Sequence, residues 1–285
     1  MRLAIYGSRR QEPYIADIAA FFQSLADSHV EAVLHSKLYT YLRDNIPGSL
    51  RAVCRVTDKS DFTADYAVCI GGDGSFLRTA AWVGDRQIPI VGVNTGHLGY
   101  MAALSVNDLP SLPGRLAAGG AAVIESRSLI AVDCPGVTGW PYALNEVAIT
   151  KGDGASIIDV NACVDGDLLA DYRADGLLIA TPTGSTAYNL SVGGPIVQPT
   201  APVFVLSPIA AHSLSMRPLV IADTSALQFR CECRKETFRL ALDGRSYRIA
   251  IDDEVRLSRA PFDVKVVRLA GDNFASILRS KLSWG

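Results

Sequence analysis

The sequence contains a turn in which glycines surround a single carboxylate. The apolar run Tyr66–Ile70 ends in Gly71-Gly72-Asp73-Gly74 and is followed by a helix candidate, Ser75–Val83, with Ser75 as its expected cap. Glycines at a strand end let backbone N–H groups approach a phosphate, and the helix N-terminus adds positive potential. An aspartate repels a polyphosphate, so Asp73 indicates a proton acceptor or a metal partner, as phosphoryl transfer requires. The plainer alternative is a tight turn in which Asp73 caps the helix.

A second polar loop follows the next strand candidate. Residues Asn94–Tyr100 come directly after the end of the apolar run Ile88–Val93. Loops at the carboxyl ends of neighbouring parallel strands meet in one crevice. We therefore expect this loop and Asp73 to line one pocket. His97, within the loop, is better explained as an ordinary loop histidine than as a catalytic one.

Two polar groups interrupt the apolar pattern further along the chain. Asn145-Glu146 lies inside the strand-like run Tyr142–Ile149, where burying an ionised glutamate without partners is costly. The pair is either exposed on an edge strand or hydrogen-bonded to the ribose or base of a nucleotide. The run Thr181–Ser191 offers small hydroxyl groups and a glycine around a sugar or amide, or else forms a plain Ser/Thr-rich turn. Tyr188 can stack on a purine, and Arg173 is the best nearby cation for a phosphate.

The first third of the chain has the pattern of alternating strands and helices. A helix that opens at Pro13 keeps apolar residues at helical spacing, and strands that are apolar throughout suit a parallel sheet covered on both faces. The expected strands are Leu3–Tyr6, Val30–Leu34, Leu50–Val56, Tyr66–Ile70 and Ile88–Val93.

From about residue 120 the pattern becomes β-rich, and Asp-Gly dipeptides separate the runs, as in an antiparallel domain. These dipeptides begin at Asp153, Asp165, Asp175 and Asp243. Helical patterns there are limited to Ser185–Leu190 and a turn around Ala210–Leu214, and Asn273–Leu282 returns to helical spacing. We expect an α/β domain at 1–105, a β-sandwich at 106–270, and a C-terminal helix at 271–285 that packs back on the first domain.

Composition excludes several classes of protein. The net charge of −2 gives no general attraction to nucleic acid or to an anionic membrane. No apolar run approaches the roughly 20 residues of a membrane span, and no signal peptide is visible. Cys69 and Cys163 lie in strand-like runs as expected buried thiols, and Cys231-x-Cys233 alternates like strand residues rather than metal ligands. These features indicate a reduced, cytoplasmic protein.

Common nucleotide-binding motifs are also missing. The chain has no Gly-x-x-x-x-Gly-Lys-Ser/Thr loop, and no Gly-x-Gly-x-x-Gly fingerprint follows the first strand candidate. Ordinary ATPases and dehydrogenases are disfavoured for that reason.

Taken together, these residues resemble the NAD kinase family, which phosphorylates the 2′-hydroxyl of the adenosine ribose of NAD to give NADP. The resemblance runs through Gly71–Gly74, Asn94–Gly99, Asn145-Glu146, Arg173–Leu177, Thr181–Ser191, Gly193–Pro195, Ala211–Leu214, Arg217-Pro218 and Asp243-Gly244. The Gly-Gly-Asp-Gly turn is shared with phosphofructokinase-like and lipid kinases, whereas the run that begins at Thr181 is far more specific.

The resemblance implies a Rossmann-like α/β N-terminal domain with a mostly parallel sheet, an all-β C-terminal sandwich, and an NAD site between them. Asp73 is the implied proton acceptor, and Gly71–Gly74 is the implied turn for the phosphate donor. The implied NAD-binding residues are Asp73, Gly74, Arg78, Asn145, Glu146, Arg173, Asp175, Thr186, Ala187, Tyr188, Asn189, Leu190, Ser191 and Ala210. Arg78 is equally consistent with a solvated helix residue.

Further expectations concern partners and cofactors. ATP and NAD are the implied substrates, Mg²⁺ arrives with ATP without direct protein ligands, and a neighbouring subunit of a homo-oligomer (dimer or tetramer) helps to close the site. The chain departs from the family at Ser75, where threonine is usual, and at the variable positions Ser156, Gln198 and Arg245. The alternatives are a lipid or sugar kinase with the same glycine turn, and a non-catalytic NADP(H)-binding sensor.

Overall fold

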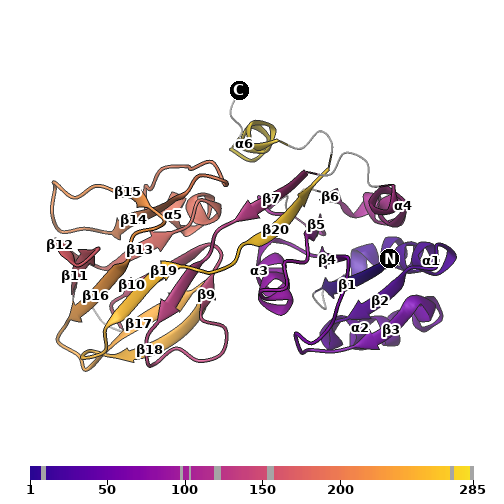
Figure 1. Ribbon diagram of the computed structural model, residues 1–285, viewed down its shortest axis with the longest axis horizontal. Coiled ribbons are helices and arrows are strands. Elements are labelled where there is room, and N and C mark those ends of the chain that lie inside the picture. Colours follow the sequence, from indigo (N-terminus) through magenta and orange to yellow (C-terminus); the bar gives the residue numbers. More distant parts are fainter. Residues whose placement is uncertain are drawn as a thin grey trace. The chain divides into compact units, whose positions relative to one another are not determined.

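The computed structural model of this chain describes residues 1–7, 11–96, 99–102, 104–118, 123–152, 157–269 and 273–282. The chain divides into two compact units, residues 1–126 together with 264–285, and residues 127–263 (Figure 1). The first unit is α/β and the second is built from antiparallel strands, so the expected fold class is confirmed.

In the described part of the first unit, eight strands form one sheet in the order β3-β2-β1-β4-β5-β20-β7, with β6 beside β5. The successive strand pairs from β3 as far as β20 are all parallel. The strands are β1 (Arg2–Gly7), β2 (Glu31–Leu34), β3 (Val53–Val56), β4 (Tyr66–Ile70), β5 (Ile90–Asn94), β6 (Leu104–Ser105), β7 (Val123–Arg127) and β20 (Val264–Arg268).

Helices pack on this sheet through apolar faces. Ile18, Phe22 and Leu25 of the first helix are fully buried, as their helical spacing predicts, and they share a core with β1. The helices are α1 (Ile15–Asp27), α2 (Ser36–Asn45), α3 (Asp73–Val83), α4 (Leu112–Ala117) and α6 (Phe274–Leu282), with 3₁₀ segments at Glu12–Tyr14, Pro47–Ala52 and Val106–Ser111.

Two local predictions in this unit are wrong. Residues 50–52 belong to a 3₁₀ segment, so only Val53–Val56 of the predicted strand is extended; a Pro-Gly pair at 47–48 starts that turn. The helix predicted from Ser75 begins at Asp73, and its N-cap is Gly72 without a side-chain hydrogen bond. Ser75 is therefore not the cap.

The compact units also differ from the expected domain ranges. Residues 106–126 and the strand β20 lie in the first unit, although the sequence placed them in the second domain. The cause is that β20 pairs in parallel with β5, and a short apolar run does not reveal which sheet it will join.

The second unit consists of two six-stranded antiparallel sheets in its described residues, ordered β15-β14-β13-β10-β17-β18 and β12-β11-β16-β19-β8-β9. The apolar core lies between the sheets and includes Phe204, Phe229 and Leu240. The strands are β8 (Ile130–Asp133), β9 (Tyr142–Ala143), β10 (Glu146–Thr150), β11 (Ile158–Val164), β12 (Asp167–Ala174), β13 (Gly176–Ala180), β14 (Val203–Ile209), β15 (Leu219–Ala222), β16 (Leu227–Glu232), β17 (Thr237–Leu242), β18 (Arg245–Ala250) and β19 (Val255–Arg259).

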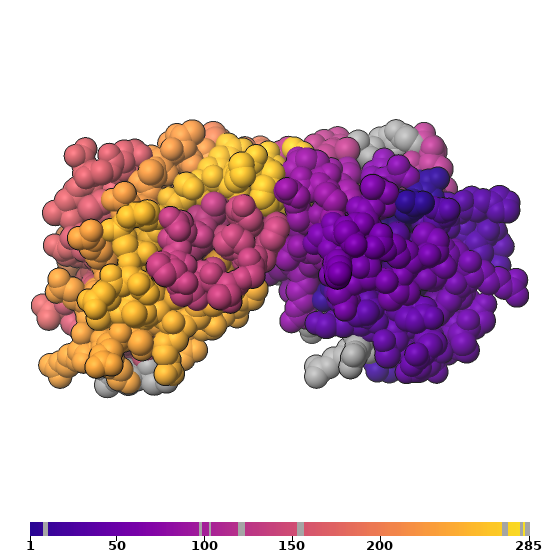
Figure 2. Space-filling model, turned by 60° about the horizontal axis from the view of Figure 1, so that its bottom comes forward, coloured from indigo at the N-terminus to yellow at the C-terminus, as the bar shows by residue number. Residues whose placement is uncertain are grey.

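Strands that are distant in sequence lie side by side in these sheets. Strand β19 pairs with β8, more than a hundred residues earlier in the chain. In the space-filling view, magenta atoms of the earlier part of this unit are accordingly bordered by yellow atoms of its last strands (Figure 2).

The Asp-Gly dipeptides play different roles. Asp165-Gly166 and Asp243-Gly244 have positive φ at both residues and turn the hairpins β11–β12 and β17–β18, as predicted. Gly176 instead begins β13, where a Cβ would lie 2.4 Å from the carbonyl oxygen of Ile149. Asp153-Gly154 falls outside the described residues.

Little helix is present in the second unit. The helix predicted at Ser185–Leu190 is a 3₁₀ segment, Thr183–Thr186, followed by the short helix α5 (Tyr188–Ser191). The turn predicted around Ala210–Leu214 forms no helix.

Candidate active site

The carboxylate of Asp73 is held by backbone groups of a neighbouring loop. Asp73 is the first residue of α3, directly after the Gly71-Gly72 connection from β4. Its Oδ2 accepts a hydrogen bond from the amide of Tyr100 at 3.0 Å, and its Oδ1 accepts one from the amide of Met101 at 3.2 Å. Asp73 therefore does not cap its own helix; its carboxylate is fixed in orientation by another segment.

The segment that holds Asp73 belongs to the loop after β5. Strands β4 and β5 are parallel neighbours, so their carboxyl ends meet at the same edge of the sheet. The predicted proximity of Asp73 and this loop is confirmed by the Tyr100 contact. Asn94 is buried, and its Oδ1 accepts the amide of Gly96 at 3.0 Å, which turns the chain at the end of β5. His97 lies outside the described residues.

Two glycines allow this arrangement and two leave space beside it. A Cβ on Gly99 would lie 2.0 Å from Oδ1 of Asp73, and Gly71 has a φ of +151° with Ser75 Oγ 2.4 Å from its Cβ position. Gly72 and Gly74 have no atom within 4 Å of theirs. The turn is thus closely packed at Gly71 and Gly99, and it is open at Gly72 and Gly74, where another group could approach.

Arg78 projects from the exposed side of α3 near the tyrosine of β1. Burial raises the pKa of Tyr6, and the Arg78 guanidinium beside the hydroxyl group opposes that rise. Tyr6 also contacts His35 edge-on, with ring centroids 4.7 Å apart. Arg78 is therefore held near the sheet as well as exposed to solvent.

In the second unit, Asn145 and Glu146 begin a central strand. Strand β10 lies between β13 and β17, and Asn145 is 7% exposed, so the exposed edge-strand alternative is wrong. Oε2 of Glu146 and Oδ1 of Asn145 are buried and have no hydrogen-bond partner among the residues that the structure describes. Burial of the Glu146 carboxyl group, reinforced by the nearby charge of Asp243, raises its pKa to about 7.

Asp243 supports this pair from the β17–β18 turn. Its carboxylate accepts the backbone amides of Leu144 at 2.8 Å, Asn145 at 2.8 Å and Glu146 at 3.2 Å. Burial raises the pKa of Asp243, and the three amide hydrogen bonds oppose that rise. The sequence analysis identified a turn here but not this carboxylate, because the pairing depends on a contact almost a hundred residues away.

The Thr181–Ser191 run is a hydrogen-bonded scaffold in the structure. Thr181 Oγ1 donates to the carbonyl of Leu144 at 2.5 Å and accepts the amide of Gly184 at 3.1 Å. A Cβ on Gly184 would lie 2.0 Å from the carbonyl oxygen of Asn145. The run is therefore packed against the Asn145-Glu146 connection.

Within this run, Asn189 and Tyr188 differ in exposure. Asn189 is fully buried; its Oδ1 accepts Ser207 Oγ at 2.7 Å and its Nδ2 donates to the carbonyl of Pro195 at 3.0 Å. Its side chain thus positions the segment. Tyr188 is 42% exposed, and its backbone amide hydrogen bond lowers the pKa of Glu146 against the effect of burial. Thr186, Ala187 and Leu190 are half-buried, and Ser191 is exposed.

The remaining predicted residues form a separate cluster. The Asp175 amide donates to the carbonyl of Ile209 at 2.9 Å, next to Ala210, which has a positive φ of 49°. Lys151 Nζ lies 2.6 Å from Asp175 Oδ1, and Arg173 pairs with Asp159 at 3.6 Å. Lys151 was missed by the sequence analysis, since only strand register brings it to Asp175.

Strand register separates this cluster from Glu146. Glu146 lies opposite Ala180, whereas Thr150 lies opposite Gly176, at the other end of the same antiparallel pair. Four residue steps along a strand correspond to roughly 14 Å. One small group of a ligand therefore cannot contact both clusters within this unit.

Two of the variable positions make hydrogen bonds within the second unit. Arg245 donates Nη1 to the carbonyl of Trp140 at 2.5 Å and Nε to that of Leu242 at 3.1 Å, so it braces the hairpin. Gln198 is exposed and donates to Thr200 Oγ1 at 3.4 Å. Ser156 lies outside the described residues.

No helix in the described part of the chain is long and apolar enough to span a membrane.

Comparison with known proteins places this geometry in a family. Residues 21–121 match the ATP-NAD kinase N-terminal domain and residues 144–269 match the ATP-NAD kinase C-terminal domain. The NAD kinase of Porphyromonas gingivalis is 43% identical over 284 residues, covering 100% of this chain and 98% of that protein.

Solved structures share the fold. Yeast NADH kinase complexed with NADH has a TM-score of 0.86 at 20% sequence identity, covering 100% of this chain and 88% of that one. An NAD kinase from Archaeoglobus fulgidus in complex with ATP has a TM-score of 0.73 at 24% identity, covering 99% and 98%.

The α/β unit with its aspartate-bearing glycine turn, next to a β-sandwich in the chain, is the architecture of a kinase. The chain belongs to the NAD kinase family, as its motifs predicted. The matches to NAD kinases do not favour the two alternatives, a lipid or sugar kinase and a non-catalytic sensor.

Proposed function

We propose that this chain transfers the γ-phosphoryl group of ATP to the 2′-hydroxyl of the adenosine ribose of NAD, with Asp73 as the general base. The ribose oxygen forms the new bond to the γ-phosphorus while the bond to the bridging oxygen of ADP breaks. The hydroxyl proton passes to the carboxylate of Asp73, which contributes on the order of 10²–10⁴-fold.

The fixed carboxylate of Asp73 carries this proposal. Its oxygens accept two backbone amides, so its orientation does not depend on substrate, and each oxygen keeps a further lone pair for the ribose proton. Gly72 and Gly74 leave their flanks clear. A base fixed before substrate binds needs no reorganisation during the reaction.

The triphosphate is proposed to lie against the Gly71–Gly74 turn, with Arg78 as an auxiliary cation. Backbone amides at the start of α3 suit phosphate oxygens. Among the described residues, no group of three or more potential ligand side chains is placed to hold a metal ion. Mg²⁺ prefers phosphate oxygens and waters, which fits these residues if the ion enters with ATP. When bound, it neutralises phosphate charge beside Asp73.

NAD is proposed to bind Asn145, Glu146 and the 186–191 segment. The unpartnered Glu146 Oε2 and Asn145 Oδ1 suit ribose hydroxyls or an amide, which would satisfy buried atoms that lack partners. Asn189 contributes by holding the segment, and Tyr188 offers an exposed ring for stacking.

We further propose that Arg173, Asp175 and Ala210 serve the site of a neighbouring copy in a homo-oligomer. Their separation from Glu146 along the strand pair supports this assignment. Mixing Asp73→Asn with Asp175→Asn protein under exchange conditions should give more activity than either variant has alone, because one site of each hybrid then holds both native residues. Equal, unrestored activity in verified hybrids would show that both residues act within one chain.

The six cysteines are unpaired, in accord with a reducing cytoplasmic location.

A direct assay tests the proposed reaction. Purified protein is incubated with NAD, ATP and Mg²⁺, and NADP is measured with an NADP-specific dehydrogenase. Asp73→Asn should lower kcat by about 10²–10⁴-fold while NAD binding, measured by calorimetry, is retained. Turnover near that of the parent would contradict the role of Asp73. Parallel reactions with polyphosphate and with NADH define the donor and acceptor range.

A further inference from the structure

Tyr6 lies at the edge of the first sheet that carries the glycine turn. Strand β1 runs parallel to β4, with Tyr6 opposite Cys69, and β4 leads directly into Gly71–Gly74. The carboxyl ends of neighbouring parallel strands meet at one edge of a sheet. The end of β1 therefore adjoins the turn on which the triphosphate is proposed to lie.

The ring of Tyr6 is fixed by aromatic side chains of two other segments. Tyr6 is 3% exposed, and its ring centroid lies 4.7 Å from that of His35 and 6.3 Å from that of Trp82. His35 is the N-cap of α2, where its Nδ1 accepts the amide of Lys37 at 3.3 Å, and Trp82 belongs to α3. A buried ring held from both segments gives its hydroxyl group one position.

Arg78 shares one side of α3 with Gly74 and Trp82. The three residues are spaced four apart, and Trp82 contacts Tyr6, so this side of the helix faces the end of β1. Long side chains in a helix lean toward its N-terminus, which directs Arg78 over the first turn. Arg78 is exposed, and the Cβ position of Gly74 has no atom within 4 Å. A ligand at the turn therefore has access to the guanidinium.

The phenol of Tyr6 and the guanidinium of Arg78 interact directly. Burial raises the pKa of Tyr6, whereas the charge of Arg78 and its hydrogen bond to the hydroxyl group lower it. The phenol is protonated at neutral pH, so its oxygen accepts an N–H of Arg78 without neutralising the charge. A carboxylate in the same place would form an ion pair and compete with a phosphate. Tyr6 therefore orients Arg78 and leaves it cationic.

We propose that Tyr6 is a positioning residue that holds the Arg78 guanidinium ready for the phosphates of the donor. This inference rests on the proposed function, in which the triphosphate lies against Gly71–Gly74. An arginine whose conformation is set before the ligand binds loses less freedom on binding. Its planar fork then meets two phosphate oxygens at once.

A double-mutant cycle tests the coupling of Tyr6 to Arg78. Binding of a non-hydrolysable ATP analogue with Mg²⁺ is measured by calorimetry for the parent, Tyr6→Phe, Arg78→Gln and the double variant. Tyr6→Phe keeps the ring and should weaken binding about fivefold, because the ligand must then order the side chain of Arg78. Arg78→Gln should weaken binding about tenfold or more. In the Arg78→Gln background, Tyr6→Phe should change binding less than about twofold.

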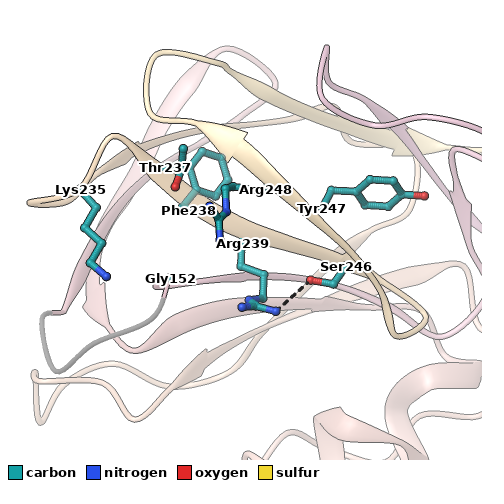
Figure 3. Close-up of a pocket in the computed structure, with 8 residues that line it drawn as sticks. All are labelled: Gly152, Lys235, Thr237, Phe238, Arg239, Ser246, Tyr247 and Arg248. Atoms are coloured by element: carbon teal, nitrogen blue, oxygen red, sulfur yellow. Dashed lines mark hydrogen bonds between the residues drawn. The ribbon is translucent and has the colours of Figure 1, made fainter.

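Two variants control for the loss of a hydroxyl group. Tyr66→Phe alters a half-buried tyrosine at the amino end of β4, on the opposite edge of the same sheet. Ser246→Ala alters a hydroxyl–arginine pair of the second unit, where Ser246 Oγ accepts Arg239 Nη1 at 3.4 Å in a pocket on the β17–β18 hairpin (Figure 3). Each control should change binding of the analogue less than about twofold.

Steady-state kinetics separates positioning from a general structural defect. Tyr6→Phe should raise KM for ATP about fivefold and KM for NAD less than about twofold, and it should melt within a few degrees of the parent. Unchanged affinity in Tyr6→Phe, an equal loss in both backgrounds, or an equal rise of both KM values would overturn the role of Tyr6. A parent that binds the analogue but forms no NADP would instead contradict the proposed function, and the calorimetric cycle would still decide the role of Tyr6.

Discussion

Two aspartates in this molecule are held in the same way and differ in surroundings. Asp73 in the first unit accepts two backbone amides from the loop after β5, and Asp243 in the second accepts three from the start of β10. Both residues are half-buried, but Asp73 stands beside glycines with free space, whereas burial of the Asp243 carboxyl group raises its pKa. Backbone amides orient a carboxylate in both cases, and the space beside Asp73 leaves room for a substrate.

A turn can be predicted correctly from an Asp-Gly dipeptide although the role of its carboxylate is not. Both residues stand in Asp-Gly dipeptides, and short-range rules treat each as a turn. Asp243 does turn a hairpin, but its carboxylate mainly stabilises the backbone that presents Asn145 and Glu146. The carboxylate of Asp73 does not stabilise its own turn, because its hydrogen-bond donors belong to the loop after β5.

The largest contrast is expected between Asp73→Asn and Asp243→Asn. The first should reduce kcat as described above and change the free energy of unfolding by less than about 1 kcal/mol, since the asparagine oxygen can still accept one of the two amides. The second should lower the free energy of unfolding by roughly 2–3 kcal/mol, because its amide group cannot accept three buried N–H groups. Urea unfolding and steady-state kinetics on both variants check this, and equal stability losses would remove the distinction.

A smaller effect is expected from Glu146→Gln, and it depends on pH. Because the pKa of Glu146 is raised from 4.5 to about 7, the folded state binds more protons than the unfolded state between these values. The free energy of unfolding of the parent should therefore fall as pH rises from about 5 to 8. Over the same range, the free energy of unfolding of the variant should rise relative to that of the parent by on the order of 2 kcal/mol. Urea unfolding across this range measures the gain. Glu236→Gln, an exposed position, controls for loss of a carboxylate, and a pH-independent difference at Glu146 would contradict the burial argument.

The fold was predicted more fully than the site. Apolar periodicity identified the buried face of α1 and the parallel strands β4 and β5, because local pattern and burial agree there. It failed for residues 50–52 and for β20, where a turn and a long-range pairing decide the structure. Lys151 and the carboxylate role of Asp243 were not predictable, since each depends on strand register across distant segments.

Gly99→Ala tests the packing behind Asp73 and should have a moderate effect. The new methyl carbon would begin 2.0 Å from Asp73 Oδ1, so either the loop or the carboxylate must move. We expect kcat to fall about tenfold with a smaller change in KM, since a displaced base loses positioning more than substrate binding. Gly96→Ala, whose Cβ position has no atom within 4 Å, is the matched control. Unchanged kcat in Gly99→Ala would show that the carboxylate tolerates displacement.

The smallest effect is expected at Ala210, where the second cluster meets backbone strain. Its φ of 49° costs an alanine on the order of 1 kcal/mol relative to glycine. Ala210→Gly relieves this strain but adds freedom to the unfolded chain, so the net gain in unfolding free energy should be about 0.5 kcal/mol or less. Ala241→Gly, inside strand β17, should instead lose stability. If Ala210→Gly lowers kcat despite equal or greater stability, the strained backbone positions the Asp175 cluster; if kcat is unchanged, the strain serves only the turn after β14.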